Sequence, residues 1–152
     1  MNIRLMTIDD YDGLYDLWLN TPGMGLNDTD DSREGIEKYL RRNPSTSFVA
    51  EENGKILGAI LCGHDGRRGM LQHTAVRVSE RNRGIATALV DHALAALDKE
   101  GITKVFLVAF EKNELGNTFW ENRGFTTRPD LVYRNKYIKG ITYSKNIYMD
   151  KE

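Results

Sequence analysis

The sequence predicts a mixed α/β fold in a single domain, residues 1–152. Two observations carry this prediction: segments with strand-like and helix-like spacing alternate along the 152 residues, and no Pro/Gly/Ser-rich linker divides them. Hydrophobic residues make up 40% of the chain and charged residues 28%, which is enough apolar side chain for a sizeable core. The element order that we expect is β-α-α-β-β-β-α-β-α-β-β.

The first third of the chain reads as a strand followed by two helices. Asn2–Met6 has the alternating apolar residues of an edge strand. The next helix is indicated by side chains at i, i+3, i+4 and i+7, namely Tyr11, Leu14, Tyr15 and Trp18. It ends near Pro22, because proline disfavours a helical residue before it. Asp31, with a glutamate three residues later, predicts the N-cap of a second helix that runs to about Arg42.

Three strands are expected in the middle of the chain, at Ser47–Glu51, Lys55–Cys62 and Met70–Val78. The first two are joined by Asn-Gly, a strong hairpin turn. A helix follows from Arg83 to about Lys99, and its apolar residues are spaced by four. Val105–Phe110 is a continuous apolar run, which is typical of a strand covered on both faces.

The last third predicts a short helix and two more strands. Asn113 is a suitable N-cap, and Gly124 is a suitable residue to close that helix. Leu131–Ile138 and Ile141–Met149 are tyrosine-rich strand candidates on either side of a Lys-Gly pair.

The amino-acid composition argues against several kinds of binding partner. The chain has 21 basic and 22 acidic residues, so no basic excess points to a nucleic acid or a membrane surface. Its apolar runs are too short to span a bilayer, and its first residues lack the apolar region of a signal peptide. The single cysteine, Cys62, excludes an intrachain disulfide and a cysteine-based zinc cluster. We therefore expect a cytoplasmic protein without a metal, either a monomer or a homodimer.

The segment most informative about chemistry runs from Val76 to Thr87, where a strand ends, a polar turn follows and a helix begins. The first amides of a helix have no partner within it and lie at the positive end of its dipole, so they can bind phosphate. Gly84 and Ala86 let the backbone approach an anion closely, and nearby arginines add positive charge. The spacing alone also fits an ordinary glycine-containing turn with solvated arginines.

Arg81–Ala86 resembles the Arg/Gln-x-x-Gly-x-Gly/Ala motif of the GNAT superfamily of N-acetyltransferases. Asn113–Phe125 is similar to that family's Asn-x-x-Ala-x-x-Phe-Tyr-x-x-x-Gly-Phe segment. Two motifs in the family's order are far more specific than either alone, and the predicted element order also matches. The resemblance covers nearly the whole chain and implies a splayed mixed sheet.

The resemblance implies an acetyl-CoA-dependent N-acetyltransferase whose cofactor lies between two parallel strands, Met70–Val78 and Val105–Phe110. A bulge in the first of these strands, common in the family, would spread them apart. Backbone groups of Val76 and Val78 would pair with the pantetheine amides. The residues implied to hold the pyrophosphate are Arg81, Asn82, Arg83, Gly84, Ile85, Ala86 and Thr87, and those implied to contact the cofactor from the next helix are Asn113, Asn117 and Trp120.

Direct transfer to an amine needs a base, because an alkylammonium has no free lone pair at neutral pH. His73 is the best single candidate, since it lies in the strand that would flank the acetyl group and histidine titrates near neutrality. The alternative for His73 is a structural role. Trp120 occupies the position at which many family members have a tyrosine that acts as general acid, and an indole N–H cannot deliver a proton. The general acid is therefore unassigned. Three other tyrosines could take the role of the family's tyrosine: Tyr133, Tyr137 and Tyr143.

The acceptor is expected to be a primary amine of unknown identity, on a small molecule, a peptide N-terminus or a lysine. Asp28 and Asp30, in the loop between the first two helices, and Asp65, in a later turn, could attract a cationic amine. A solvated helix-capping cluster explains the loop carboxylates equally well. Two other classes compete with the enzyme: a non-catalytic acyl-CoA-binding module, favoured by Trp120, and a nucleotide-binding α/β protein, disfavoured because no phosphate-loop lysine motif is present.

Overall fold

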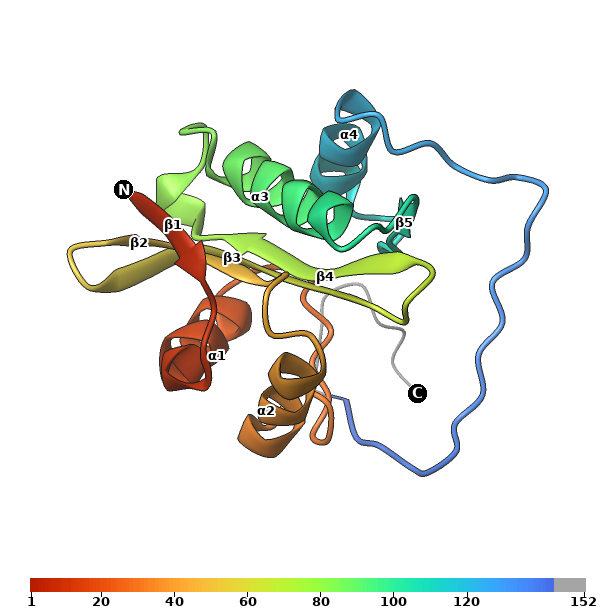
Figure 1. Cartoon of the computed structure of the whole chain (residues 1–152), viewed down its shortest axis with the longest axis horizontal. Helices are drawn as coiled ribbons and strands as arrows, with labels where there is room; N and C mark the ends of the chain where they lie inside the picture. Colours follow the sequence, from red (N-terminus) through yellow and green to blue (C-terminus); the bar gives the residue numbers. More distant parts are fainter. Residues whose placement is uncertain (144–152) are drawn as a thin grey trace.

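The computed structural model describes residues 1–143, which form one mixed sheet with helices on both faces (Figure 1). The sheet has five strands in the order β1-β2-β3-β4-β5, antiparallel from β1 to β4 and parallel between β4 and β5. The strands are β1 (Asn2–Leu5), β2 (Phe48–Glu52), β3 (Lys55–His64), β4 (Gly69–Val76) and β5 (Val105–Phe106). The helices are α1 (Tyr11–Leu19), α2 (Arg33–Arg42), α3 (Ile85–Lys99) and α4 (Glu114–Asn122), with short 3-10 turns at Ile8–Asp10 and Val78–Glu80. The mixed α/β prediction is confirmed.

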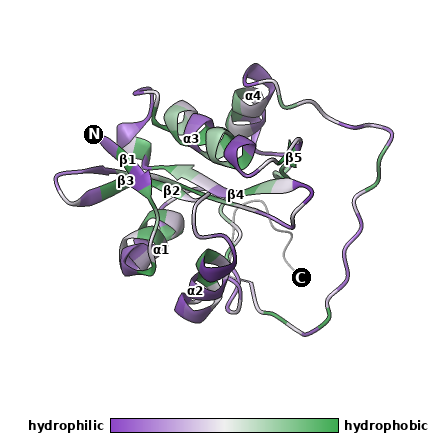
Figure 2. Ribbon diagram, viewed as in Figure 1, coloured by the Kyte–Doolittle hydropathy of each residue, from purple (hydrophilic) through white to green (hydrophobic). Residues whose placement is uncertain are grey.

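The sheet separates two apolar clusters, one under each pair of helices. Helices α1 and α2 lie on one face, and α3 and α4 lie on the other (Figure 1). The α1 side is built around Leu14, Leu17 and Trp18, which are at most 1% exposed. The α3 side is built around its buried residues Ile85, Leu89, Val90, Ala93 and Leu97. Strand β3 lies between these two clusters, and it is therefore buried from Ile56 to Gly63 and appears as a largely apolar band in Figure 2.

Two predicted helix starts are wrong. Helix α2 is capped by Ser32, whose hydroxyl accepts the Gly35 amide at 3.0 Å, and not by Asp31. Helix α3 begins at Ile85 rather than Arg83, because Gly84 has a left-handed φ of +77° that no right-handed helix continues. Among residues 1–143, none of the helices has the length and apolar character needed to cross a membrane.

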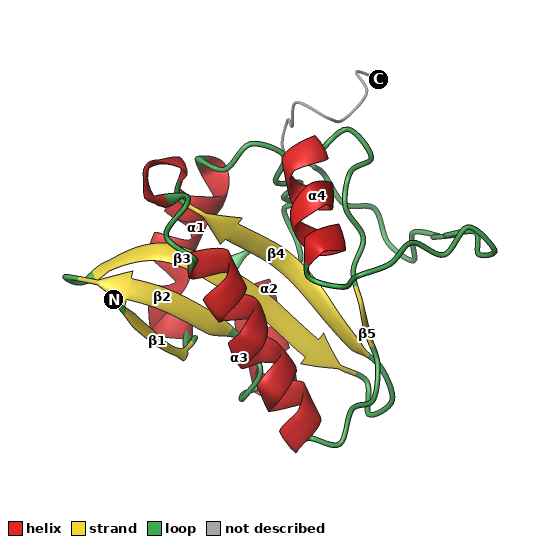
Figure 3. Ribbon diagram, turned by 90° about the horizontal axis from the view of Figure 1, so that it is seen from above, coloured by secondary structure: helices red, strands yellow, loops and turns green. Residues whose placement is uncertain are grey.

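The C-terminal strands are also corrected. The ladder of β5 stops at Phe106, and Phe106 and Val108 are 46% and 55% exposed, so the apolar run is not covered on both faces. Leu131–Ile138 forms no strand, because these residues extend away from the sheet and have no ladder partner (Figure 3). The second candidate, Ile141–Met149, falls mostly outside the described residues; in its described part, residues 141–143, Tyr143 forms an isolated bridge to Asn27.

Candidate active site

Strands β4 and β5 diverge and leave one edge of β4 open. They are paired only at Gly69 with Val105 and Met70 with Phe106, whereas β4 continues to Val76. On its other side β4 carries a bulge: Ala75 pairs with Ala59 and Gln72 pairs with Leu61, so two residues of β4 lie opposite one residue of β3. The predicted bulge is confirmed. It lies at His73, whose φ of +44° is left-handed.

The bulge places His73 beside a buried carboxylate. Its Nε2 lies 2.6 Å from Oδ1 of Asp31, which is only 5% exposed. The ring of Trp18 meets the imidazole edge-on, with centroids 5.1 Å apart. The other carboxylate oxygen of Asp31 accepts the Asn27 amide at 2.8 Å, and its backbone carbonyl accepts the hydroxyl of Tyr11. The imidazole is thus fixed on one side by a hydrogen bond to a carboxylate and on another by an indole.

Sequence reasoning missed Asp31 as a site residue because the helix-capping pattern explained it. A signal was available, since Ser32 is itself a suitable N-cap and leaves the preceding aspartate free for another role. The structure gives the two adjacent residues different tasks: Ser32 starts α2, and Asp31 contacts a strand 42 residues later.

The turn between β4 and α3 presents free backbone donors. Among residues 1–143, the amides from Arg81 to Thr87 donate to no protein acceptor. Asn82 and Gly84 both have positive φ, at 65° and 77°, and this turns successive peptide units toward solvent. A Cβ added to Gly84 would meet nothing within 4 Å, so the space beside Gly84 is open. This is the geometry of an anion site at a helix N-terminus.

The arginines of this turn differ in how their charge is used. Arg83 pairs with Glu80 at 2.6 Å and with Glu52 at 3.2 Å, and these carboxylates raise its pKa. Arg83 in turn lowers the pKa of Glu52. Arg81 is exposed and has no ion-pair partner in the described part of the chain. Arg81 therefore keeps its full charge for an incoming anion, whereas that of Arg83 is already shared.

Other predicted cofactor residues are at different places. Val76 lies in β4 as predicted, but it is the last residue of the strand, and Val78 lies in the following 3-10 turn instead of the strand. Ile85, Ala86 and Thr87 form the first turn of α3.

The two asparagines of α4 fasten that helix. Asn113 caps it through the Gly116 amide at 3.0 Å, and Asn117 donates to the carbonyl of Phe110 at 3.0 Å. Trp120 packs edge-on between Phe119 and Phe125, with centroid distances of 5.0 and 5.1 Å. These contacts explain the residue types structurally, and contact with a cofactor remains a prediction for all three.

The predicted acceptor carboxylates do not gather in one place. Asp28 and Asp30 are exposed in the loop before α2, where Asp28 accepts the Thr142 amide at 3.0 Å and this bond lowers its pKa. Asp65 lies in the β3–β4 turn and accepts the amides of Arg68 and Arg67, which lower its pKa. That turn is at the opposite end of β4 from the anion site.

The other titratable groups offer no metal site. Within the described residues, no three His, Cys, Asp or Glu side chains are grouped so that they could hold a metal ion. Burial raises the pKa of Cys62 to about 12, and its neighbour His64 instead accepts the Gly66 amide and lies near Glu100.

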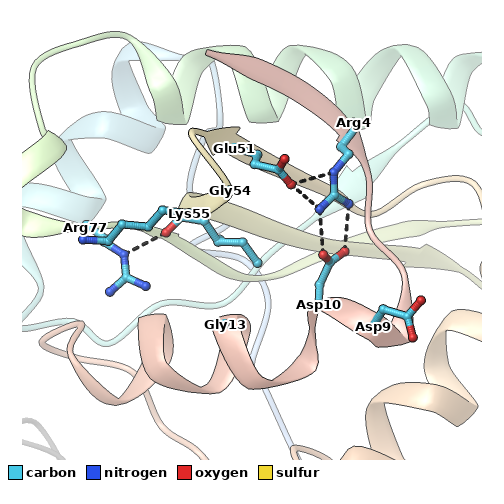
Figure 4. Close-up of a pocket in the computed structure, with 9 residues that line it drawn as sticks. Arg4, Asp9, Asp10, Gly13, Glu51, Gly54, Lys55 and Arg77 are labelled. Carbon is cyan, nitrogen blue, oxygen red and sulfur yellow. Dashed lines mark hydrogen bonds and ion pairs between the residues drawn. The ribbon is translucent and has the colours of Figure 1, made fainter.

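A separate hollow of about 310 Å³ lies between the start of α1 and the β2–β3 hairpin (Figure 4). Arg4 crosses it to bind Asp10 and Glu51, and Arg77 forms its other end. It contains neither His73 nor the N-terminus of α3, so the bulge and the anion site lie outside it.

Comparison of the chain with protein families, with related sequences and with solved structures gives one consistent result. Residues 11–125 match the model of the acetyltransferase (GNAT) family. An acetyltransferase of Photorhabdus laumondii is 30% identical, over 100% of this chain and 99% of the relative.

Among solved structures, the PaiA N-acetyltransferase from Thermoplasma acidophilum in complex with coenzyme A superposes with a TM-score of 0.73 at 18% identity, over 84% of this chain and 90% of that one. The aminoglycoside 6'-N-acetyltransferase AAC(6')-IG from Acinetobacter haemolyticus gives a TM-score of 0.66 at 17% identity, over 91% and 100%. At these identities the structures show a common fold. Together with the family match and the curated relative, they establish that the chain is an acetyltransferase that belongs to the GNAT family.

Proposed function

We propose that the protein transfers an acetyl group directly from acetyl-CoA to a primary amine, and that His73 is the base that removes the proton of the acceptor. The observation that carries the proposal is the 2.6 Å contact between His73 and the buried Asp31, located on the bulge of β4 beside the opening between β4 and β5.

The anion site, which is the turn between β4 and the start of α3, would bind the acetyl donor, acetyl-CoA. The free amides at the start of α3 and the unpaired guanidinium of Arg81 suit a pyrophosphate. The open edge of β4 that ends at Val76 suits the pantetheine, whose amides can bond to it like an added strand. Because Val78 has left the strand, we assign this pairing to Val76 and the residues before it.

The Asp31–His73 pair accounts for the base. A 2.6 Å contact between Nε2 and Oδ1 holds one proton, so in the neutral imidazole Nε2 donates to Asp31 and Nδ1 carries the lone pair. Nδ1 then takes the proton of the ammonium, and the imidazolium so formed is stabilised by the carboxylate. Asp31 acts only through the histidine and is a positioning residue.

The departing thiolate needs no acid from the chain in this proposal. A free thiol has a pKa of about 8.5, so the thiolate is a tolerable leaving group that water can protonate. Trp120 packs within an aromatic cluster and cannot supply the proton. Tyr133 and Tyr137 are 71% and 60% exposed. Tyr143 bridges Asn27, but its hydrogen bond with Tyr137 raises its pKa to about 12, which makes it a poor proton donor at neutral pH.

We propose that the acceptor is cationic before it loses its proton, with Asp28 and Asp30 attracting it from the loop beside Asp31. Asp65 has no part in this proposal, because backbone amides occupy one of its oxygens and its turn lies at the far end of β4.

A thiol-release assay tests the function: acetyl-CoA is supplied with a panel of small amines, polyamines, aminoglycosides and peptides with a free N-terminus or lysine. Thiol release that depends on one class of amine supports the proposal, and His73→Ala should lower that rate while coenzyme A still binds. Binding of coenzyme A without amine-dependent turnover across the panel would instead favour a non-catalytic acyl-CoA-binding module.

A further inference from the structure

Residues 126–141, here called the arm, leave the molecule after α4 and return only at the loop before α2. Figures 1 and 3 both show this segment standing away from the sheet and helices. Every residue from 126 to 140 is exposed. The arm is nevertheless fixed at both ends: Phe125 packs on Trp120, and Thr142 exchanges hydrogen bonds with Asp28.

The arm carries large apolar side chains on both sides of the polar residues Arg134, Asn135 and Lys136. Leu131, Val132, Tyr133 and Ile138 are 60%, 75%, 71% and 98% exposed. Among residues 1–143, no backbone hydrogen bond joins residues 129–140 to another element; Leu131 bonds only to Arg128 within the arm. The apolar side chains of this extended segment gain neither ladder bonds nor burial against residues 1–143, so the described part of one copy does not explain its conformation.

The same molecule has an unpaired sheet edge that needs such a strand. β5 is the last strand of the sheet, and no described residue pairs with its outer side. Val105 and Leu107 turn into the α3 cluster, whereas Phe106 and Val108 are 46% and 55% exposed on the opposite face. An open apolar edge of this kind is a template for another strand.

We propose that two copies of the chain exchange their arms, so that residues 131–138 of each copy lie along β5 of the other. The exchange matches the two unfilled features, a strand without a sheet and a sheet edge without a strand. Because each copy both gives and receives an arm, the contact is self-complementary and closes as a twofold dimer instead of a growing fibre. Alternation in the arm places Leu131, Tyr133 and Tyr137 on one face, suited to cover Phe106 and Val108.

The mass of the full-length protein in solution, measured by light scattering after size exclusion, tests the exchange. We expect twice the chain mass of 17.3 kDa for the wild type and the single-chain mass for Tyr133→Asp. Tyr133 is exposed in one copy, so this change leaves the fold intact, and an unchanged circular dichroism spectrum checks that. Leu19→Asp is the matched control, since Leu19 is 58% exposed on α1, and it should remain dimeric. A monomeric wild type, or a Tyr133→Asp variant that stays dimeric, overturns the proposal.

A cross-link distinguishes exchange from folding back within one copy. Tagged Val108→Cys and untagged Tyr133→Cys chains are co-expressed, purified through the tag and treated with a short bis-maleimide. The native Cys62 is buried and does not compete. A covalent product of both chains supports exchange. If the mixed chains give no such product while the double variant Val108→Cys/Tyr133→Cys cross-links within a single chain, the arm pairs with its own sheet and the proposal is wrong.

Discussion

Asp31→Asn is the change that isolates the positioning of His73. An asparagine is nearly isosteric, and its oxygen can still accept the Asn27 amide that Asp31 accepts at 2.8 Å, so the fold should survive. The change removes the negative charge 2.6 Å from Nε2, and it allows an amide N–H to face the ring and favour the wrong tautomer. Both effects penalise the imidazolium that forms when His73 accepts a proton.

The size of the effect follows from that one contact. A hydrogen bond to a charged group contributes about 1.5–3 kcal/mol. At about 1.4 kcal/mol per factor of ten, kcat should fall roughly ten- to 150-fold at neutral pH. The acetyl-CoA concentration that gives half-maximal rate should hardly change, because Asp31 lies on the α1 side of the sheet and the anion site is at α3.

The assay is thiol release with the best amine of the panel, together with a thermal melt of each variant. Asp30→Asn is the matched control, since it removes an exposed carboxylate from the same loop. It should leave kcat within about twofold, because attraction of the amine by Asp30 affects the amine concentration needed for half-maximal rate and not the saturated rate. A folded Asp31→Asn protein with the wild-type kcat would refute the positioning role.

Three further predictions follow from the same site. His73→Ala should lower turnover more at pH 7 than at pH 10, where the amine loses its proton without help, and parallel pH–rate profiles for variant and wild type would remove His73 as the base. Arg81→Ala should weaken coenzyme A binding by up to about fivefold and lower the salt dependence of that binding. Arg83→Ala should weaken binding less, because Glu80 and Glu52 already bind that side chain. Calorimetry at two salt concentrations measures both effects, and a larger loss of affinity for Arg83→Ala would contradict the charge assignment. Because burial raises the pKa of Cys62 to about 12, a thiol reagent at pH 8 should label the protein only after denaturant is added, and immediate labelling of the native protein would show that the thiol is accessible.

The site features fixed by local chemistry could be predicted from the sequence. An anion site in the turn before α3 requires residues that adopt positive φ and a helix whose first amides are free. The residue types of Asn82–Ala86 predict both features. The hairpin at Asn53-Gly54 is local in the same sense, and both of its residues have positive φ.

The features that depend on partners distant in sequence could not be predicted. Asp31 and His73 are 42 positions apart, and only the packing of α1 and the loop before α2 against the bulge brings them together. The tyrosine-rich composition of Leu131–Ile138 indicates a tendency to form a strand but not whether a sheet edge lies within reach. The short ladder of β5 could not be predicted for the same reason, because the length of a strand depends on how far its neighbouring strand runs beside it.

The most direct test of the account is a calorimetric titration of coenzyme A into the wild type and into Gly84→Glu. Gly84 has a φ of +77° and open space beside it, so a glutamate there strains the turn and sets a carboxylate beside the proposed pyrophosphate site. We expect saturable binding to the wild type and at least roughly tenfold weaker binding to a folded variant. Equal affinity for the two proteins, or no binding to the wild type, would contradict it.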